Sequence, residues 1–170
     1  MKPKPIIASL LAALVAAITI FLRVPIPKSG GYLNLGDVLV VFAGLYLGPK
    51  YGMLVGGVGS ALADAVGFPI FILPTLLIKG AEGGLSGLFH DRKFRVVGPI
   101  LGALVMVGGY FIAEALMFRQ RIGMAAALTE LPFNLIQGAA GVLGGYGLHA
   151  VIRNWTKEED VGVRKQTGGR

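Results

Sequence analysis

Long apolar stretches, separated only by short polar connections, make up most of this chain. A helix needs about 20 predominantly apolar residues to cross the hydrocarbon core of a bilayer. Charged residues account for 15% of the chain, against about 25% in a typical soluble domain. The sequence therefore predicts an all-α membrane protein, a bundle of six transmembrane helices in one domain over residues 1–152. The six segments are residues 5–22, 36–48, 51–67, 70–89, 96–118 and 128–152.

The second segment is shorter than a bilayer is thick. A helix over residues 36–48 rises about 1.5 Å per residue and falls well short of the hydrocarbon core, which is about 30 Å thick. Pro49 follows Gly48 directly after it, which indicates a tight break before the third segment. These two segments are therefore expected to form a helical hairpin with one short leg.

Basic residues predict the orientation. Lysines and arginines gather at the N-terminus, between the fourth and fifth segments and after the sixth, with Lys50 between the second and third. Since cytoplasmic loops carry the excess of such residues, both termini are expected in the cytoplasm of a prokaryotic cell. The net charge of +7 then reflects topology rather than nucleic-acid binding. The first segment lacks a small-residue cleavage site and is expected to be a retained helix. Residues 153–170 are expected to form a polar, disordered cytoplasmic tail.

Polar residues inside the segments occur at one depth, mainly in the outer halves. A lone charge at the bilayer centre costs roughly 2.5–3.5 kcal/mol, so these groups must face one another, water or a ligand. Their common depth predicts a pocket that opens to the outside. The candidate substrate-binding residues are Tyr32, Asn34, Asp64, Lys79, Glu82, Tyr110, Glu114, Asn134 and Gln137.

Several of these residues leave alternatives open. Lys79 and Glu82 are three residues apart and share a helix face, so they either bracket a ligand or only pair with each other. Asn134 and Gln137 have the same spacing, and their amides can both donate and accept, as recognition of a small heterocycle requires. Asp37 is equally well explained as an N-terminal helix cap.

Two further features carry less information. Glu130 lies in a Thr-Glu-Leu-Pro stretch and could stand in water at the start of an interfacial helix. A stripe of small residues marks the first segment, and it suits close helix packing, either within the bundle or against a partner. The stripe consists of Ala8, Ala12, Ala13, Ala16 and Ala17.

Several motifs of enzymes and metal proteins are absent from the sequence. There are no cysteines, which excludes disulfides, zinc–thiolate sites and iron–sulfur clusters. The chain lacks a Walker A motif, the H-E-x-x-H zinc motif and the G-x-S-x-G serine elbow. We therefore expect no metal, no cofactor and no enzymatic activity, with a non-catalytic membrane scaffold or a membrane enzyme as the rival interpretations.

Three stretches of the sequence stand out together, namely NLGDVLVVFAGLYLGPKYGMLVGGVGSALADAVG, PTLLIKGAEGGLSGL and LPFNLIQGAAGVLGGYGL. They resemble the substrate-binding S components of energy-coupling factor (ECF) transporters. The resemblance covers everything except the tail, and the nearest branch is the one associated with hydroxymethylpyrimidine or pyridoxine. It implies six helices, a pocket capped by the loop after the first helix, and capture of a B vitamin or precursor.

The same resemblance implies partners. An S component works with a transmembrane coupling subunit and two cytoplasmic ATPases, which use the ATP, and the alanine stripe would be its contact to the coupling subunit. The membrane segments contain no tryptophan, on which a thiamine binder of this family would stack its ligand. Thiamine itself is therefore disfavoured, and riboflavin, folate or pantothenate remain alternatives. The acidic pocket favours a neutral or weakly cationic heterocycle.

Overall fold

The computed structural model describes residues 4–27, 31–89, 94–117 and 123–167, with the side chains of all but 117 and 156–167. The described chain is almost entirely helical, which confirms the all-α prediction, and it adds one small antiparallel hairpin. Its elements are α1 (Lys4–Phe21), β1 (Val24–Pro25), β2 (Tyr32–Leu33), α2 (Gly36–Leu47), α3 (Pro49–Gly67), the 3₁₀ helix η1 (Pro69–Phe71), α4 (Ile72–Leu88), α5 (Val97–Met117) and α6 (Gly123–Thr167).

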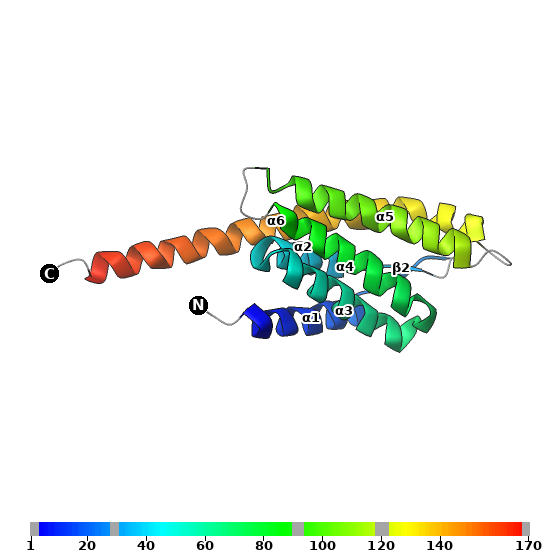
Figure 1. Ribbon diagram of the computed structural model, residues 1–170, viewed down its shortest axis with the longest axis horizontal. Coiled ribbons are helices and arrows are strands. Elements are labelled where there is room, and N and C mark those ends of the chain that lie inside the picture. The colour runs from blue at the N-terminus through cyan, green and yellow to red at the C-terminus, as the bar shows by residue number, and fades with distance from the viewer. Residues whose placement is uncertain (1–3, 28–30, 90–93, 118–122, 168–170) are drawn as a thin grey trace.

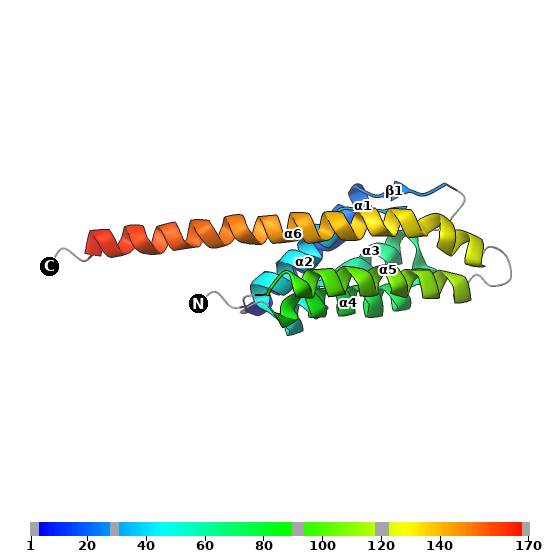
Figure 2. The ribbon, with the colours of Figure 1, turned by 90° about the horizontal axis from the view of Figure 1, so that it is seen from above.

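The six α-helices run along one common axis (Figure 1). In the described part of the chain, three stretches are long and apolar enough to cross a membrane, namely Lys4–Phe21, Val97–Leu116 and Gly123–Trp155. Large apolar side chains cover the outside of the bundle, and Leu10 is 67% exposed. An apolar outer surface on an apolar bundle is the surface that lipid covers. The start of α1 and the end of α6 lie at the same end of the molecule (Figures 1 and 2).

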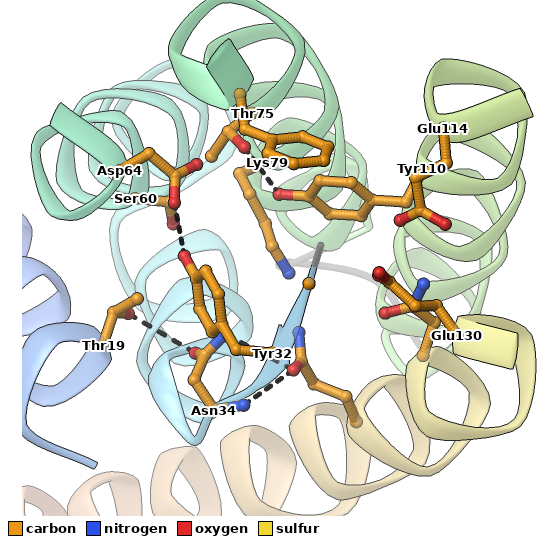
Figure 3. A pocket seen from close by; sticks show the side chains of 14 residues that line it. Thr19, Tyr32, Asn34, Ser60, Asp64, Thr75, Lys79, Tyr110, Glu114 and Glu130 are labelled. Atoms are coloured by element: carbon orange, nitrogen blue, oxygen red, sulfur yellow. Dashed lines mark hydrogen bonds between the residues drawn. The ribbon is translucent and has the colours of Figure 1, made fainter. Parts of the chain in front are cut away.

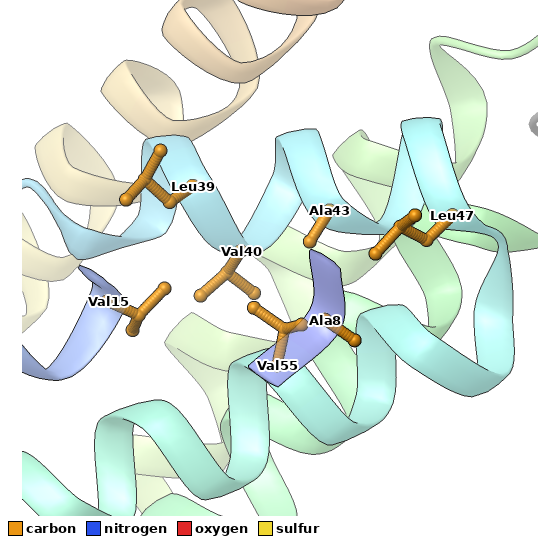
Figure 4. Packing of buried hydrophobic residues seen from close by; sticks show 7 residues of the cluster. All are labelled: Ala8, Val15, Leu39, Val40, Ala43, Leu47 and Val55. Atoms are coloured by element: carbon orange, nitrogen blue, oxygen red, sulfur yellow. The ribbon is translucent and has the colours of Figure 1, made fainter. Parts of the chain in front are cut away.

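The helices pack so that α2 lies inside the bundle. It contacts α1, α3, α4 and α6, while α3 also packs on α1 and α4, and α5 on α4 and α6 (Figure 2). Most residues of α2 are buried, as expected for an apolar helix that lies between other helices. Apolar side chains from α1, α2 and α3 meet in a shared core (Figure 4), which contains Ala8, Val15, Leu39, Val40, Ala43, Leu47 and Val55.

The predicted hairpin of the second and third segments is confirmed. Gly48 alone joins α2 to α3, with a φ of 91°, a conformation that glycine adopts without the strain a side chain would cause. Its N–H donates to Gly44 O, and Pro49 occupies the first turn of α3, where the missing N–H of proline is harmless.

Glycines let α3 and α4 approach until their backbones touch. A Cβ atom added to Gly52 would collide with the carbonyl oxygen of Gly83, and one added to Gly83 would collide with the carbonyl oxygen of Gly52. Small residues at a helix interface serve this purpose in membrane proteins. The contact brings the polar face of α4 up to α2 and α3.

One expectation from the sequence requires correction, and one open alternative is divided. Residues 153–167 are not disordered in this structure, because α6 continues as a helix to Thr167 and extends past the bundle (Figure 1). The alanine stripe of α1, for which packing within the bundle and contact with a partner were both left open, is divided in this structure. Ala8 and Ala12 are buried against the bundle, while Ala13 is exposed and Ala16 and Ala17 are half-buried.

Candidate functional site

A polar pocket lies beside β2 (Figure 3), and β2 is toward the end of the bundle opposite the termini (Figure 1). The cavity itself is about 30 Å³, and the space between the lining atoms reaches about 440 Å³ when the open mouth is included. The lining comes from the β2 segment, η1 and every α-helix except α2. It comprises Thr19, Gly31, Tyr32, Asn34, Ser60, Asp64, Phe71, Thr75, Lys79, Tyr110, Glu114, Glu130, Asn134 and Gln137.

The pocket gathers the predicted binding residues with one exception. Glu82 does not line it but lies behind Lys79, fully buried. Three further polar residues of the lining, Thr19, Ser60 and Thr75, were not predicted from the sequence. A helical signal existed for two of them: Ser60 precedes Asp64 by four residues, and Thr75 precedes Lys79 by four, so each shares a face with a residue already chosen.

Lys79 forms the floor of the pocket and is held by two carboxylates. Its Nζ donates to Asp37 Oδ1 at 2.5 Å and to Glu82 Oε2 at 2.9 Å, and all three side chains are at least 98% buried. The alternative of Asp37 as a helix cap is wrong, because α2 has no side-chain capping bond and the carboxylate points to Lys79. The two carboxylates satisfy the ammonium without a ligand, as a buried charge requires.

A chain of hydrogen bonds connects this floor to the segment after β2. Gln137 Nε2 donates to Asp37 Oδ2 at 3.0 Å, and Gln137 Oε1 accepts from the backbone N–H of Asn34 at 2.8 Å. Asn34 Oδ1 accepts from the N–H of Gly36 at 2.7 Å and from the hydroxyl of Thr19 at 3.4 Å. Through these bonds Gln137 of α6 connects Asp37, at the start of α2, to Asn34, in the segment after β2.

Tyr32 closes one side of the pocket. Its hydroxyl donates to Asp64 Oδ1 at 2.5 Å, and its ring lies 4.8 Å from that of Phe68 (Figure 3). The guanidinium of Arg23 lies over the other ring, 5.3 Å from the centroid of Phe68. Burial and the neighbouring Asp64 raise the pKa of Tyr32 far above its usual range, so its hydroxyl stays a hydrogen-bond donor.

Tyr110 and Thr75 form a second tie, between α5 and α4. Their hydroxyl groups lie 2.9 Å apart, and the ring of Tyr110 lies 5.7 Å from Lys79 Nζ (Figure 3). An aromatic face toward an ammonium adds a cation–π attraction to the floor of the pocket.

Glu114 of α5 and Glu130 of α6 lie beside each other on the remaining wall (Figure 3). Glu114 is 1% exposed and Glu130 3% exposed, so the alternative that Glu130 stands in water is wrong. Glu114 Oε2 and Glu130 Oε1 are buried without a hydrogen-bond partner. Two buried acceptors of this kind are costly unless something supplies donors.

A protein-family model matches residues 4–154, which is nearly the whole described chain. That family is described as "ECF-type riboflavin transporter, S component". The chain belongs to the S components of ECF transporters. This S component is the substrate-binding membrane subunit of such a transporter, and its family consists of transport proteins rather than enzymes.

Two relatives extend the comparison. The S component is 37% identical over 143 residues to the "Uncharacterized protein in gap 3'region" of Pyrococcus woesei, which covers 82% of this chain and 94% of the relative. It is 35% identical over 119 residues to the thiamine precursor transporter HmpT of Lactococcus lactis, which covers 69% of this chain and 68% of the relative.

A solved structure has the same fold. It is the S component of a bacterial ECF transporter, and it superposes with a TM-score of 0.72 at 22% identity, covering 91% of this chain and 97% of the other. The resemblance to ECF S components is therefore confirmed at the level of family and fold.

Proposed function

We propose that this S component captures a small nitrogen heterocycle of the hydroxymethylpyrimidine or pyridoxine type for uptake into the cell. The observation that carries the proposal is the polar pocket itself, in which hydroxyl, amide and carboxyl groups from β2 and from α1, α3, α4, α5 and α6 surround one space. Such mixed donors and acceptors in an enclosed site suit a ring that carries both. The 35% identity to HmpT, a thiamine precursor transporter, supports the same ligand class.

The size of the pocket favours a one-ring ligand. Ligand pockets in proteins are about 300–1,000 Å³, whereas the cavity here is about 30 Å³, so even a one-ring ligand requires the walls to move outward and a larger ligand requires more movement. Its charge argues against an anionic ligand, because Lys79 already faces Asp37 and Glu82, whereas Glu114 and Glu130 remain open. Folate and pantothenate, which both carry carboxylates, fit this balance poorly.

Riboflavin is the second candidate, because the matching family model is described by that vitamin. It is neutral, so charge does not exclude it. Its three fused rings and sugar-alcohol chain, however, would need the pocket to widen, and Tyr32 and Phe71 would have to move outward from its walls.

We further propose that the pocket opens to the outside and that both termini are cytoplasmic. The part of α1 that is not buried in the bundle, at exposed Ala13 and half-buried Ala16 and Ala17, would contact a transmembrane coupling subunit that works with two cytoplasmic ATPases. The small side chains there allow a partner helix to come close, which supports this assignment.

Calorimetry on the purified full chain in detergent tests the ligand class. Hydroxymethylpyrimidine, pyridoxine, thiamine and riboflavin are titrated in turn. We expect binding of the first or second compound and little or none of riboflavin. Binding of riboflavin alone would favour the second candidate, and binding of none of the compounds by a folded protein would contradict both.

A further inference from the structure

The Glu114 and Glu130 side chains form an acidic wall in which the two carboxyl groups bond each other and one oxygen of each has no hydrogen-bond partner in the described part of the chain. The bare oxygens, Glu114 Oε2 and Glu130 Oε1, are both buried and both belong to pocket-lining residues. Within the described residues, the salt bridges of Lys79 go to Asp37 and Glu82 only. The one lysine of the pocket is therefore already engaged and does not balance this wall.

A third side chain beside this wall, which is polar but uncharged, also lacks a hydrogen-bond partner within the ranges that the structure describes. Asn134 lies one helical turn from Glu130 on α6, lines the pocket and is 6% exposed. Among the described residues it makes no hydrogen bond, in contrast to its neighbour Gln137, which is bonded on both of its amide atoms. A buried amide left without partners beside two bare carboxyl oxygens leaves a gap in the polar network that a ligand can fill.

The arrangement dictates what that ligand must supply. Carboxyl oxygens accept, so the ligand must donate hydrogen bonds to two acceptors from neighbouring helices. The amide of Asn134 can then meet either an acceptor or a further donor on the same molecule. An amino group beside a ring nitrogen, or a primary ammonium, presents such donors, whereas a ring carbonyl at the same place would face the carboxyl groups with its own lone pairs.

From this arrangement we infer that Glu114 and Glu130 together form the specificity site for an amino group on the ligand. The inference rests on the proposed function and narrows it: the substrate is a heterocycle that carries an amino or aminomethyl group. The same ring binds more weakly with a hydroxyl group in that position, which donates one hydrogen bond instead of two, and with an oxo group, which donates none. Hydrogen bonds to charged groups contribute enough to make this a roughly 10- to 100-fold preference in Kd.

The test compares matched ligands on the purified full chain. Hydroxymethylpyrimidine with its ring amino group is titrated against the analogue in which an oxo group replaces the amino group, and pyridoxamine is titrated against pyridoxine. We expect the amino-bearing member of at least one pair to bind about 10- to 100-fold more tightly. Equal affinity within both pairs would overturn the inference while leaving the proposed function intact. If no compound binds, the proposed function itself fails.

Variants then locate the preference. Glu114→Gln and Glu130→Gln keep the side-chain shape but replace a carboxyl oxygen with a donor, so each is expected to weaken the amino-bearing ligand and to shrink its advantage toward equality. Thr129→Ala is the matched control, since Thr129 precedes Glu130 on α6, is exposed and bonds only its own helix at Ala125 O. A preference that survives both glutamine variants, in protein with an unchanged circular dichroism spectrum, would contradict the assignment. So would ligand binding that requires sodium ions but ignores the amino group.

Discussion

Lys79 and Asp37 are joined by a 2.5 Å ion pair although 42 positions separate them in the chain. The pair connects α4 to the first turn of α2, and Glu82 completes it from the next turn of α4. In the low-dielectric interior of a membrane protein, each of these charges depends on the others. The floor of the pocket is therefore also a structural joint of the bundle.

Removing the ammonium should destabilise the bundle strongly. We expect Lys79→Met to lower the free energy of unfolding by about 3–5 kcal/mol, because two buried carboxylates lose their partner. Titration of the protein in mixed micelles with a denaturing detergent measures this. Lys50→Met, at an exposed position of α3, serves as the control and should have little effect. Adding Asp37→Asn and Glu82→Gln to Lys79→Met should restore part of the loss, and a triple variant no more stable than the single one would contradict this account.

The backbone contact between α3 and α4 predicts a second stability effect. Gly52→Ala places a methyl group against the carbonyl oxygen of Gly83, so it should cost about 1–3 kcal/mol through overpacking. At Gly147 of α6 an added Cβ meets nothing within 4 Å, so Gly147→Ala should be neutral or slightly stabilising. Melting temperatures of the two variants give the comparison, and equal melting temperatures would show that the contact is not tight.

Tyr32 should govern how long a ligand stays in the pocket. In Tyr32→Phe the ring can still stack on Phe68, but the hydroxyl that donates to Asp64 is gone. One hydrogen bond to a carboxylate accounts for roughly a tenfold effect, so we expect dissociation to become about tenfold faster with a smaller change in association. Stopped-flow release of bound ligand measures the rate. Tyr46→Phe is the control, because Tyr46 is partly exposed and stacks on Phe42 instead. Unchanged release would mean that Tyr32 does not hold the pocket closed.

Because only part of the alanine stripe is exposed, substitutions in it should distinguish an effect on transport from an effect on ligand binding or stability. Ala13 is exposed, so Ala13→Leu should leave ligand affinity unchanged while it reduces uptake by vesicles that contain the complete transporter. Ala12 is buried, so Ala12→Leu should lower the melting temperature as well. Full uptake by the Ala13 variant would argue against α1 as the coupling surface.

Local sequence patterns were enough to predict most of the helices and part of the pocket lining. Long apolar runs predict the helices because both lipid and the protein interior favour apolar side chains. The spacing of Lys79 and Glu82, at i and i+3, indicated one polar helix face. The second partner of Lys79 was harder to predict, because Asp37 lies on another helix and approaches Lys79 only when α2 and α4 pack together. Glu130 was misjudged for the same reason: its neighbour Glu114 is on another helix, and a loop-like local sequence gave no sign of burial.

The helical continuation of α6 was missed because composition outweighed helix propensity. Residues 153–167 are rich in lysine, arginine, glutamate and glutamine, a composition typical of disordered tails. The same residues are also good helix formers, and a helix that already exists extends at low cost because nucleation is complete. Residues 153–167 therefore continue the helix that precedes them.

The shortness of α2 has a consequence for the path of a substrate. Its 12 residues rise about 18 Å, and Asp37 in its first turn bonds Lys79 at the floor of the polar pocket. In the proposed orientation, with the pocket open to the outside, a molecule seated there would have entered a hydrocarbon layer that is about 30 Å thick. The apolar distance that it still has to cross would then be roughly the length of this one helix.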